Sequence, residues 1–268
     1  MLRVGHATAL IKIRDRFVLT DPVFTETVGG LSRRMVAVGL DPRRWPPKLA
    51  VLVSHRHFDH LSTGTFSLLG DRVDAVLTPE GAAADIPRGH HRTRALEWWR
   101  SWERDGLVVT AVPAAHDGGR YLHDAAAHPR AFGGYVIEYR GIAVYFAGDT
   151  AYQPELFAQI AARFPALDLA LLPIGPISPE RMMCRHHLDP ERALDAFAAL
   201  GATQMVPIHF GTFLHSYDRP GDCESRLDDA LSRRSWLYSR VPRLAIGERR
   251  VLIPLDGTSG GSTSLSRR

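Results

Sequence analysis

The stretch from Ser54 to His60 concentrates side chains that could bind metal, because it reads Ser-His-Arg-His-Phe-Asp-His directly after an apolar run. His55 and His57 are two residues apart, so on an extended segment both imidazoles point to the same side. Asp59 and His60 follow where the chain must turn, and can reach a neighbouring point. The spacing therefore predicts two adjacent metal ions, although a histidine-rich surface loop is another interpretation of this stretch alone.

The donor types narrow the choice of metal. Imidazole with some carboxylate, and no thiolate, favours zinc, manganese or iron over copper or iron–sulfur clusters. A cluster of this kind needs ligands from elsewhere in the chain to complete two coordination shells. If such distant ligands exist, we expect two divalent ions, with zinc as the first candidate.

Three further candidate ligands stand just after apolar runs later in the chain, and they are His116, Asp149 and His209. Strand ends are where a sheet can direct several side chains to one point. His116 can complete the first site with His55 and His57. His209 can complete the second site with Asp59 and His60, and Asp149, with two oxygens, can bridge both ions.

Patterns along the chain predict strands in the first half and alternating strands and helices afterwards. The predicted helices are 62–69, 154–163, 190–200 and 222–233, and the predicted strands are 9–13, 17–20, 49–53, 73–77, 94–99, 107–112, 135–139, 142–146, 167–172 and 203–208, with a last hairpin over 243–253. This order indicates an α/β fold in which a sandwich of sheets is covered by helices. We interpret 1–254 as one domain and the low-complexity tail 255–268 as disordered.

Composition excludes several classes of protein. The 33 basic and 29 acidic groups leave a mild charge of +4, and no basic run is interleaved with aromatic residues, so we expect no nucleic-acid partner. The two cysteines, Cys184 and Cys223, form neither a disulfide framework nor a closely spaced pair. The chain shows no signal-peptide pattern and no apolar run of membrane-spanning length. We therefore expect a cytoplasmic protein without a membrane span.

The motifs resemble the metallo-β-lactamase fold superfamily. The stretch His55 to His60 is similar to its H-x-H-x-D-H signature, and the three later ligands stand in its motif order. The chain is most similar to the branch that contains N-acyl-phosphatidylethanolamine-hydrolysing phospholipase D and L-ascorbate-6-phosphate lactonase. The stretches that carry this likeness include Gly5-His6-Ala7-Thr8, Leu19-Thr20-Asp21-Pro22, Glu97-Trp98-Trp99, Phe146-Ala147-Gly148-Asp149-Thr150, His187-Leu188-Asp189-Pro190-Glu191 and His209-Phe210-Gly211-Thr212-Phe213. One departure is Asp117-Gly118-Gly119, where that branch usually has an aromatic residue and a serine.

The resemblance implies a four-layer αββα sandwich with a dinuclear metal site at one edge of the sheets. A hydroxide bridging the two ions would attack a phosphorus or carbonyl carbon. Asp59 and Asp149 would bind metal, and either could orient this nucleophile. His187 would lie near the pocket and bind the substrate or stabilise the leaving group, whereas the alternative is a histidine that merely precedes the helix start at Asp189-Pro190.

The leading functional prediction is metal-dependent hydrolysis of a phosphodiester or phosphorylated small molecule, including a lipid-derived one. Lactone or other carboxylic ester hydrolysis on the same ions is the alternative, and a non-catalytic metal-binding module is a remote one. We also predict that His6 lies beside the metal ligands. Asp21 is expected to fix its strand end through local Asx-type hydrogen bonds, and the loop over 23–47 to supply apolar and arginine contacts above the pocket.

Overall fold

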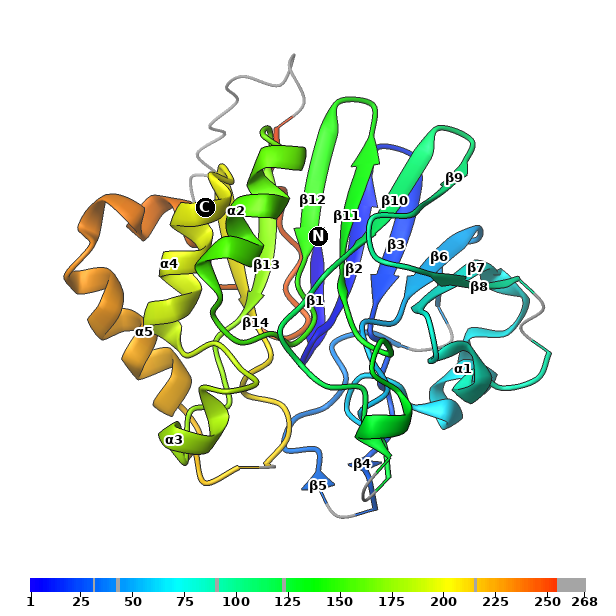
Figure 1. Cartoon of the computed structure of the whole chain (residues 1–268), viewed down its shortest axis with the longest axis horizontal. Coiled ribbons are helices and arrows are strands. Elements are labelled where there is room, and N and C mark those ends of the chain that lie inside the picture. Colours follow the sequence, from blue (N-terminus) through cyan, green and yellow to red (C-terminus); the bar gives the residue numbers. More distant parts are fainter. Residues whose placement is uncertain (31, 42–43, 90–91, 122–123, 215, 255–268) are drawn as a thin grey trace, which may run out of the picture.

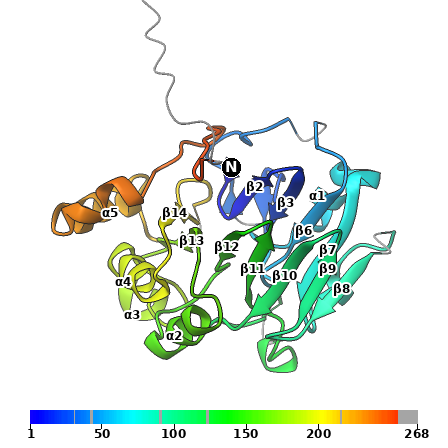
Figure 2. The same cartoon turned by 90° about the horizontal axis from the view of Figure 1, so that it is seen from above.

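The computed structural model describes residues 1–30, 32–41, 44–89, 92–121, 124–214 and 216–254. The predicted disorder of the tail 255–268 lies outside the described residues. Within the described ranges, two six-stranded sheets lie face to face with helices on their outer faces (Figure 1 and Figure 2). The predicted α/β class and the four-layer αββα sandwich are confirmed.

The strands fall into two sheets and one small additional pair. The first sheet has the order β1-β2-β3-β6-β7-β8, with bounds Leu2–Gly5, Thr8–Ile13, Arg16–Thr20, Leu49–Leu52, Val73–Pro79 and Thr93–Leu96. The second has the order β14-β13-β12-β11-β10-β9, with bounds Gln204–Ile208, Leu169–Pro173, Ile142–Phe146, Gly134–Tyr139, Leu107–Val112 and Ser101–Arg104. The pair β4 (Thr27–Val28) and β5 (Ser32–Arg33) is separate from both.

Helices cover the outer face of each sheet. Helix α1 (Thr63–Leu69) packs on the first sheet through Phe66 and Leu69. On the second sheet lie α2 (Pro154–Arg163) and α4 (Pro190–Leu200), and α5 (Asp222–Ser232) packs against α4. A single-turn helix, α3 (Glu180–Met183), follows β13. The chain outside these elements also forms short 3₁₀ turns.

The central strands are apolar throughout because both of their faces are buried. On β12, Val144 and Phe146 face the layer between the sheets, whereas Tyr145 faces the helices. On β6, Ala50 and Leu52 face the same central layer, and Val51 packs toward α1. Successive side chains of a strand point to opposite faces. One apolar run therefore contributes both to the core between the sheets and to the core between a sheet and its helices.

Strand direction brings the loops that carry the candidate ligands to one edge. Strands β3, β6, β7 and β8 are parallel, as are β12, β13 and β14. Strand β10 is antiparallel to β11, and β11 is antiparallel to β12, so β10 runs in the same direction as β12. The carboxyl ends of all these strands therefore meet at shared edges, where α/β folds place their sites.

The predicted hairpin over 243–253 is wrong, because this segment pairs with the N-terminus instead of with itself. The backbone N–H of Gly247 donates to the carbonyl of Arg3 at 2.8 Å, and that of Arg250 donates to the carbonyl of Met1 at 2.9 Å. A single bridge joins Arg249 to Leu2. Strands β1, β4, β5 and β9 and helix α3 were not predicted. Strand β9 lies at the edge of its sheet, and its four residues are all partly or fully exposed, so it lacks an apolar alternation.

The start of α4 gives a test of local stability. The Asp189 carboxylate accepts a hydrogen bond from the backbone N–H of Arg192 at 2.8 Å and caps the helix. We expect Asp189→Ala to lower the free energy of unfolding by about 1–2 kcal/mol, measured by chemical denaturation. Gln153, at the same position of α2, makes no side-chain cap, so Gln153→Ala should change little. Equal effects of the two variants would contradict the capping assignment.

Candidate metal centre

Three of the predicted ligands form a compact group of imidazoles. Nε2 of His55 lies 2.9 Å from Nδ1 of His57, and Nε2 of His116 lies 3.2 Å from that same Nδ1. A tetrahedral zinc ion bound to nitrogens at 2.0–2.1 Å holds them about 3.3 Å apart. The spacing of this trio therefore fits a single ion at its centre.

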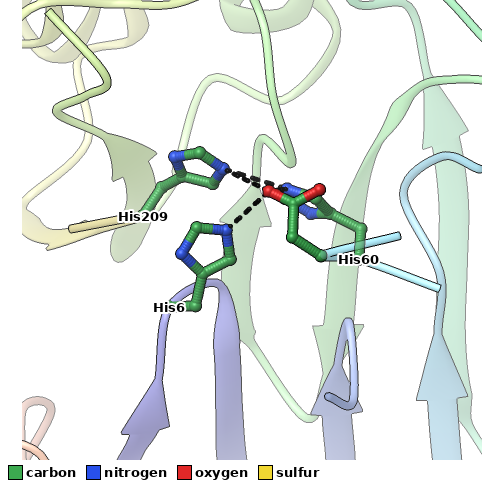
Figure 3. A group of neighbouring side chains, drawn as sticks. His6, His60 and His209 are labelled. Carbon is green, nitrogen blue, oxygen red and sulfur yellow. Dashed lines mark hydrogen bonds and ion pairs between the residues drawn. The ribbon is translucent and has the colours of Figure 1, made fainter. Parts of the chain in front are cut away.

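A second group lies beside the first. Nε2 of His60 and Nε2 of His209 are 3.0 Å apart, and Oδ2 of Asp59 lies 3.6 Å from each. Figure 3 shows His6 and His209 turned toward His60 from the opposite side of this group. Two nitrogens and a carboxylate oxygen thus converge on a second point.

Asp149 lies between the two groups. Its Oδ2 is 3.1 Å from Nε2 of His209, 3.2 Å from Nε2 of His60 and 3.9 Å from Nε2 of His55. Its Oδ1 is buried and has no hydrogen-bond partner among the described residues. A buried carboxylate oxygen without a donor is costly, and a cation would satisfy it.

The outer ring nitrogen of each imidazole lies against an oxygen. The pairs are His55 with Ser54 Oγ (2.9 Å), His57 with Asp117 Oδ1 (3.3 Å), His60 with Asp21 Oδ2 (2.6 Å), His116 with the carbonyl of His186 (2.9 Å) and His209 with the carbonyl of Gly175 (2.9 Å). Carbonyl and carboxylate oxygens only accept, so the ring nitrogens facing them donate. The Ser54 hydroxyl donates to Asp21 at 2.6 Å, so it too accepts from its histidine.

These hydrogen bonds determine the tautomer of each ring. In a neutral imidazole whose outer nitrogen donates a hydrogen bond, the other nitrogen carries no proton and points its lone pair toward the centre. This is the form that binds metal. Five such nitrogens, with nearest neighbours 2.9–3.2 Å apart, face one another. Lone pairs at this distance repel, and a cation between them converts the repulsion into coordination. The donor set therefore fits divalent metal ions.

The pKa values differ between the two groups of imidazoles. Burial lowers the pKa of His55 and of His116 well below the usual range, aided by neighbouring imidazoles, so both are neutral. Burial opposes protonation of His209 too, but the Asp149 and Asp59 carboxylates outweigh it and raise its pKa to about 9. Without a metal, this end of the cluster attracts a proton in its place.

Three residues of the centre hold left-handed backbone conformations that non-glycine residues rarely adopt. The φ angles are 54° at His6, 32° at Asp21 and 63° at His209. Hydrogen bonds hold this geometry, since the His6 N–H donates to Oγ1 of Thr212 at 2.6 Å and the His209 N–H donates to the carbonyl of His6 at 3.1 Å. Backbone strain of this kind clusters at functional sites.

The predictions for His6, His187 and Asp21 can be compared with the contacts of these residues. Nε2 of His6 lies 3.0 Å from Oδ2 of Asp59, so His6 does contact a candidate ligand. Nδ1 of His187 lies 3.4 Å from Oδ2 of Asp149, which places this ring at the centre. The local Asx-type bonds predicted for Asp21 are wrong, because its carboxylate bonds the backbone N–H and hydroxyl of Ser54, both at 2.6 Å, and the ring of His60.

Several contributors were not identified from the sequence. Ser54, Asp117 and the carbonyls of Gly175 and His186 orient the imidazoles, and nothing in their local pattern marks this role. In the loop over 23–47, the buried guanidinium of Arg34 donates to the carbonyls of Val23 and Thr25.

Curated relatives align with most of the length of this chain. An uncharacterised protein of Mycobacterium tuberculosis is 33% identical over 220 residues, covering 78% of this chain and 58% of that protein. N-acyl-phosphatidylethanolamine-hydrolyzing phospholipase D 1 of Caenorhabditis elegans is 27% identical over 256 residues, covering 85% of this chain and 69% of that protein. The chain thus spans a little over half the length of the mycobacterial relative. Among the described residues, none of the helices combines the length and apolar character needed to cross a bilayer.

The fold is also that of solved structures. The isothiocyanate hydrolase from Delia radicum gut bacteria superposes with a TM-score of 0.73 at 18% identity, covering 92% of this chain and 96% of that one. At this identity the likeness shows the fold alone. Residues 16–210, which hold every predicted ligand, match the family described as Beta-lactamase superfamily domain. The chain belongs to this superfamily.

Proposed function

We propose that this chain is a hydrolase that binds two divalent metal ions, with zinc as the first candidate and manganese or iron as alternatives. The observation that carries the proposal is the set of five inward imidazole nitrogens whose outer nitrogens are all held by oxygens. When bound, such ions polarise the scissile bond of a substrate and lower the pKa of a coordinated water. The names of the phospholipase relatives support hydrolysis.

Each ion has its own ligands in this proposal. One is held by His55, His57 and His116, the other by Asp59, His60 and His209, with Asp149 between them. The position of Asp149 supports a bridging role, because Oδ2 lies within 3.9 Å of a nitrogen from each trio. His6 holds Asp59 in place by a contact of 3.0 Å.

Two carboxylates supply the negative charge at the reacting position. Burial would raise the pKa of Asp149 and of Asp59, but the nearby histidines outweigh this effect and keep both well below their usual values. Both side chains are therefore ionised and able to accept a hydrogen bond from an attacking water. This is the orienting role we assign to them.

His187 is assigned to the substrate. Burial lowers its pKa to about 4, so the ring is neutral and can donate a hydrogen bond from one nitrogen. Its side chain is 15% exposed, which leaves it accessible from the solvent side of the centre. A neutral donor here binds a substrate oxygen or stabilises a leaving group.

Apolar side chains beside the centre support the proposal that the substrate is a lipid-derived phosphodiester. Met35 and Leu214 line a small cavity together with His6 and His209, and they are 40% and 53% exposed. Tyr121, whose ring lies 5.7 Å from that of Phe58 in the signature stretch, is 61% exposed. Exposed apolar groups next to a site are suited to an acyl or alkyl portion of a substrate.

A lactone or other carboxylic ester is the second candidate, and Asp117 favours it. This carboxylate is 38% exposed and lies 3.3 Å from Nε2 of His57. The His57 hydrogen bond holds the pKa of Asp117 far below its usual value, so it is ionised. A fixed negative charge at the mouth repels a phosphate more than an uncharged lactone.

Removing Asp149 tests the proposed chemistry. We expect zinc- or manganese-loaded protein to hydrolyse a generic phosphodiester, and Asp149→Ala to reduce turnover at least about 100-fold, because a metal ligand is lost. Asp229→Ala, on the exposed face of α5, is the control. Full turnover by Asp149→Ala would refute the proposal, whereas Asp149-dependent turnover of lactones alone would select the second candidate.

The orientation of the imidazoles can be tested separately from catalysis. We expect Asp21→Asn to weaken zinc affinity about 10- to 100-fold, because the charged acceptor of the His60 ring is lost. Competition with a chromophoric chelator measures this affinity, and Asp229→Asn serves as a matched control. Circular dichroism verifies folding; unchanged affinity in folded Asp21→Asn protein would be inconsistent with the assigned role.

His187 should matter for turnover and not for metal content. We expect His187→Ala to lower kcat about 100-fold while elemental analysis finds the metal content of the wild type. His128→Ala, outside the cluster, should behave like the wild type. Unchanged kcat with retained metal would remove His187 from the reaction.

A further inference from the structure

A second cavity lies at the end of the sandwich opposite the histidine centre. Its volume is ≈ 580 Å³, within the range of small-molecule sites. It is lined by the start of β12 and of β13, at Ile142 and Leu169, and by the turn after β2, at Arg14. Strand β12 begins at this cavity and ends just before Asp149 at the opposite end of the sandwich (Figure 1).

The inner wall of this cavity is aliphatic and is built from both sheets. Ile11 and Ile13 of β2 face Val144 of β12 and Leu169 of β13 in the layer between the sheets. All four are at most 3% exposed, so they form a closed floor. The apolar surface that a guest can reach comes from Val251, which is 80% exposed, and from the partly buried Ile142 and Ile253. This surface favours an apolar guest.

The rim is cationic. Lys12, Arg14, Arg249 and Arg250 line the cavity, and none of the described lining residues is acidic. Glu248, outside the lining, pairs with Arg250. Within the part of the chain that the structure describes, the other three cations of the rim have no acidic partner. The chain has only two lysines, so Lys12 is one of few flexible ammonium groups on this surface.

We propose that this cavity binds a single-chain amphiphile with an anionic head, of the fatty-acid class. The alkyl chain lies along Ile142, Val251 and Ile253, above the buried floor, and the carboxylate remains at the rim with Lys12 and Arg14. Burial of the chain supplies affinity, and the guanidinium recognises the carboxylate. The combination of aliphatic wall and cationic rim selects this class over cationic amphiphiles and over small anions. The proposal does not depend on the function assigned to the metal centre.

Isothermal titration with dodecanoate, below its micellar concentration, tests the proposal on the full chain. We expect saturable binding of dodecanoate, with no binding of dodecyltrimethylammonium or acetate. The double variant Lys12→Glu/Arg14→Glu should weaken dodecanoate binding about tenfold or more, because two attractive charges become repulsive. Arg88→Glu/Arg100→Glu makes the same change in net charge at exposed positions outside the cavity and should bind as the wild type.

A substitution in the lining of the cavity provides a second test. Ile142 is only partly buried, so Ile142→Trp narrows the cavity with limited risk to the core and should also weaken dodecanoate binding. Thermal unfolding verifies the fold, and if this variant does not fold, the charge variants decide. Binding that is equal in both double variants, or equal for the cationic and anionic amphiphiles, would overturn the proposal.

Discussion

The structure depends on a group of clustered imidazoles, buried or half-buried, that point lone pairs at one another. Such an arrangement is unfavourable unless a positive charge lies between the nitrogens. The protein nevertheless fixes it firmly, since Asp21 holds both Ser54 and His60 through contacts of 2.6 Å. Orienting partners of this kind determine which ring nitrogen is available to a metal. The conformation is therefore organised for a cation before one binds.

Neither sheet could form this centre alone. His55, His57 and His60 follow β6 of the first sheet, whereas His116, Asp149 and His209 follow strands of the second. The hydroxyl of Tyr135, on β11, donates to the carbonyl of Val53 at 2.8 Å and joins the two sheets beside the cluster. Gly148 is needed at this junction, because a Cβ there would collide with the side chain of Ser54.

The apolar layer between the sheets therefore positions the candidate ligands. Its side chains, such as Phe146 and Leu52, set the distance between two groups of ligands that are far apart in sequence. A close-packed interior resists small displacements, so it keeps these ligands in position. At its other end the same layer forms the closed floor of the cavity with the cationic rim.

Much of this was predictable from the sequence, because the long central strands are continuous apolar runs and the ligands directly follow them. The order of the candidate ligands His55, His116, Asp149 and His209 is visible for the same reason, and their binding of metal stays a prediction. Contacts between backbone segments that are distant in sequence could not be predicted. The segment 243–253 bonds the N-terminus, and the carbonyl of Gly175 holds His209; a carbonyl carries no sequence signal because every residue has one.

The absorption spectrum of the zinc-loaded protein at the zinc K-edge tests the central claim most directly. Our account predicts a first shell of nitrogen and oxygen at about 2.0–2.1 Å, with the multiple scattering that imidazole rings produce. The sequence has only two cysteines, and neither lies in the clusters able to hold a metal. A sulfur shell at about 2.3 Å, or a first shell without imidazole scattering, would contradict the account.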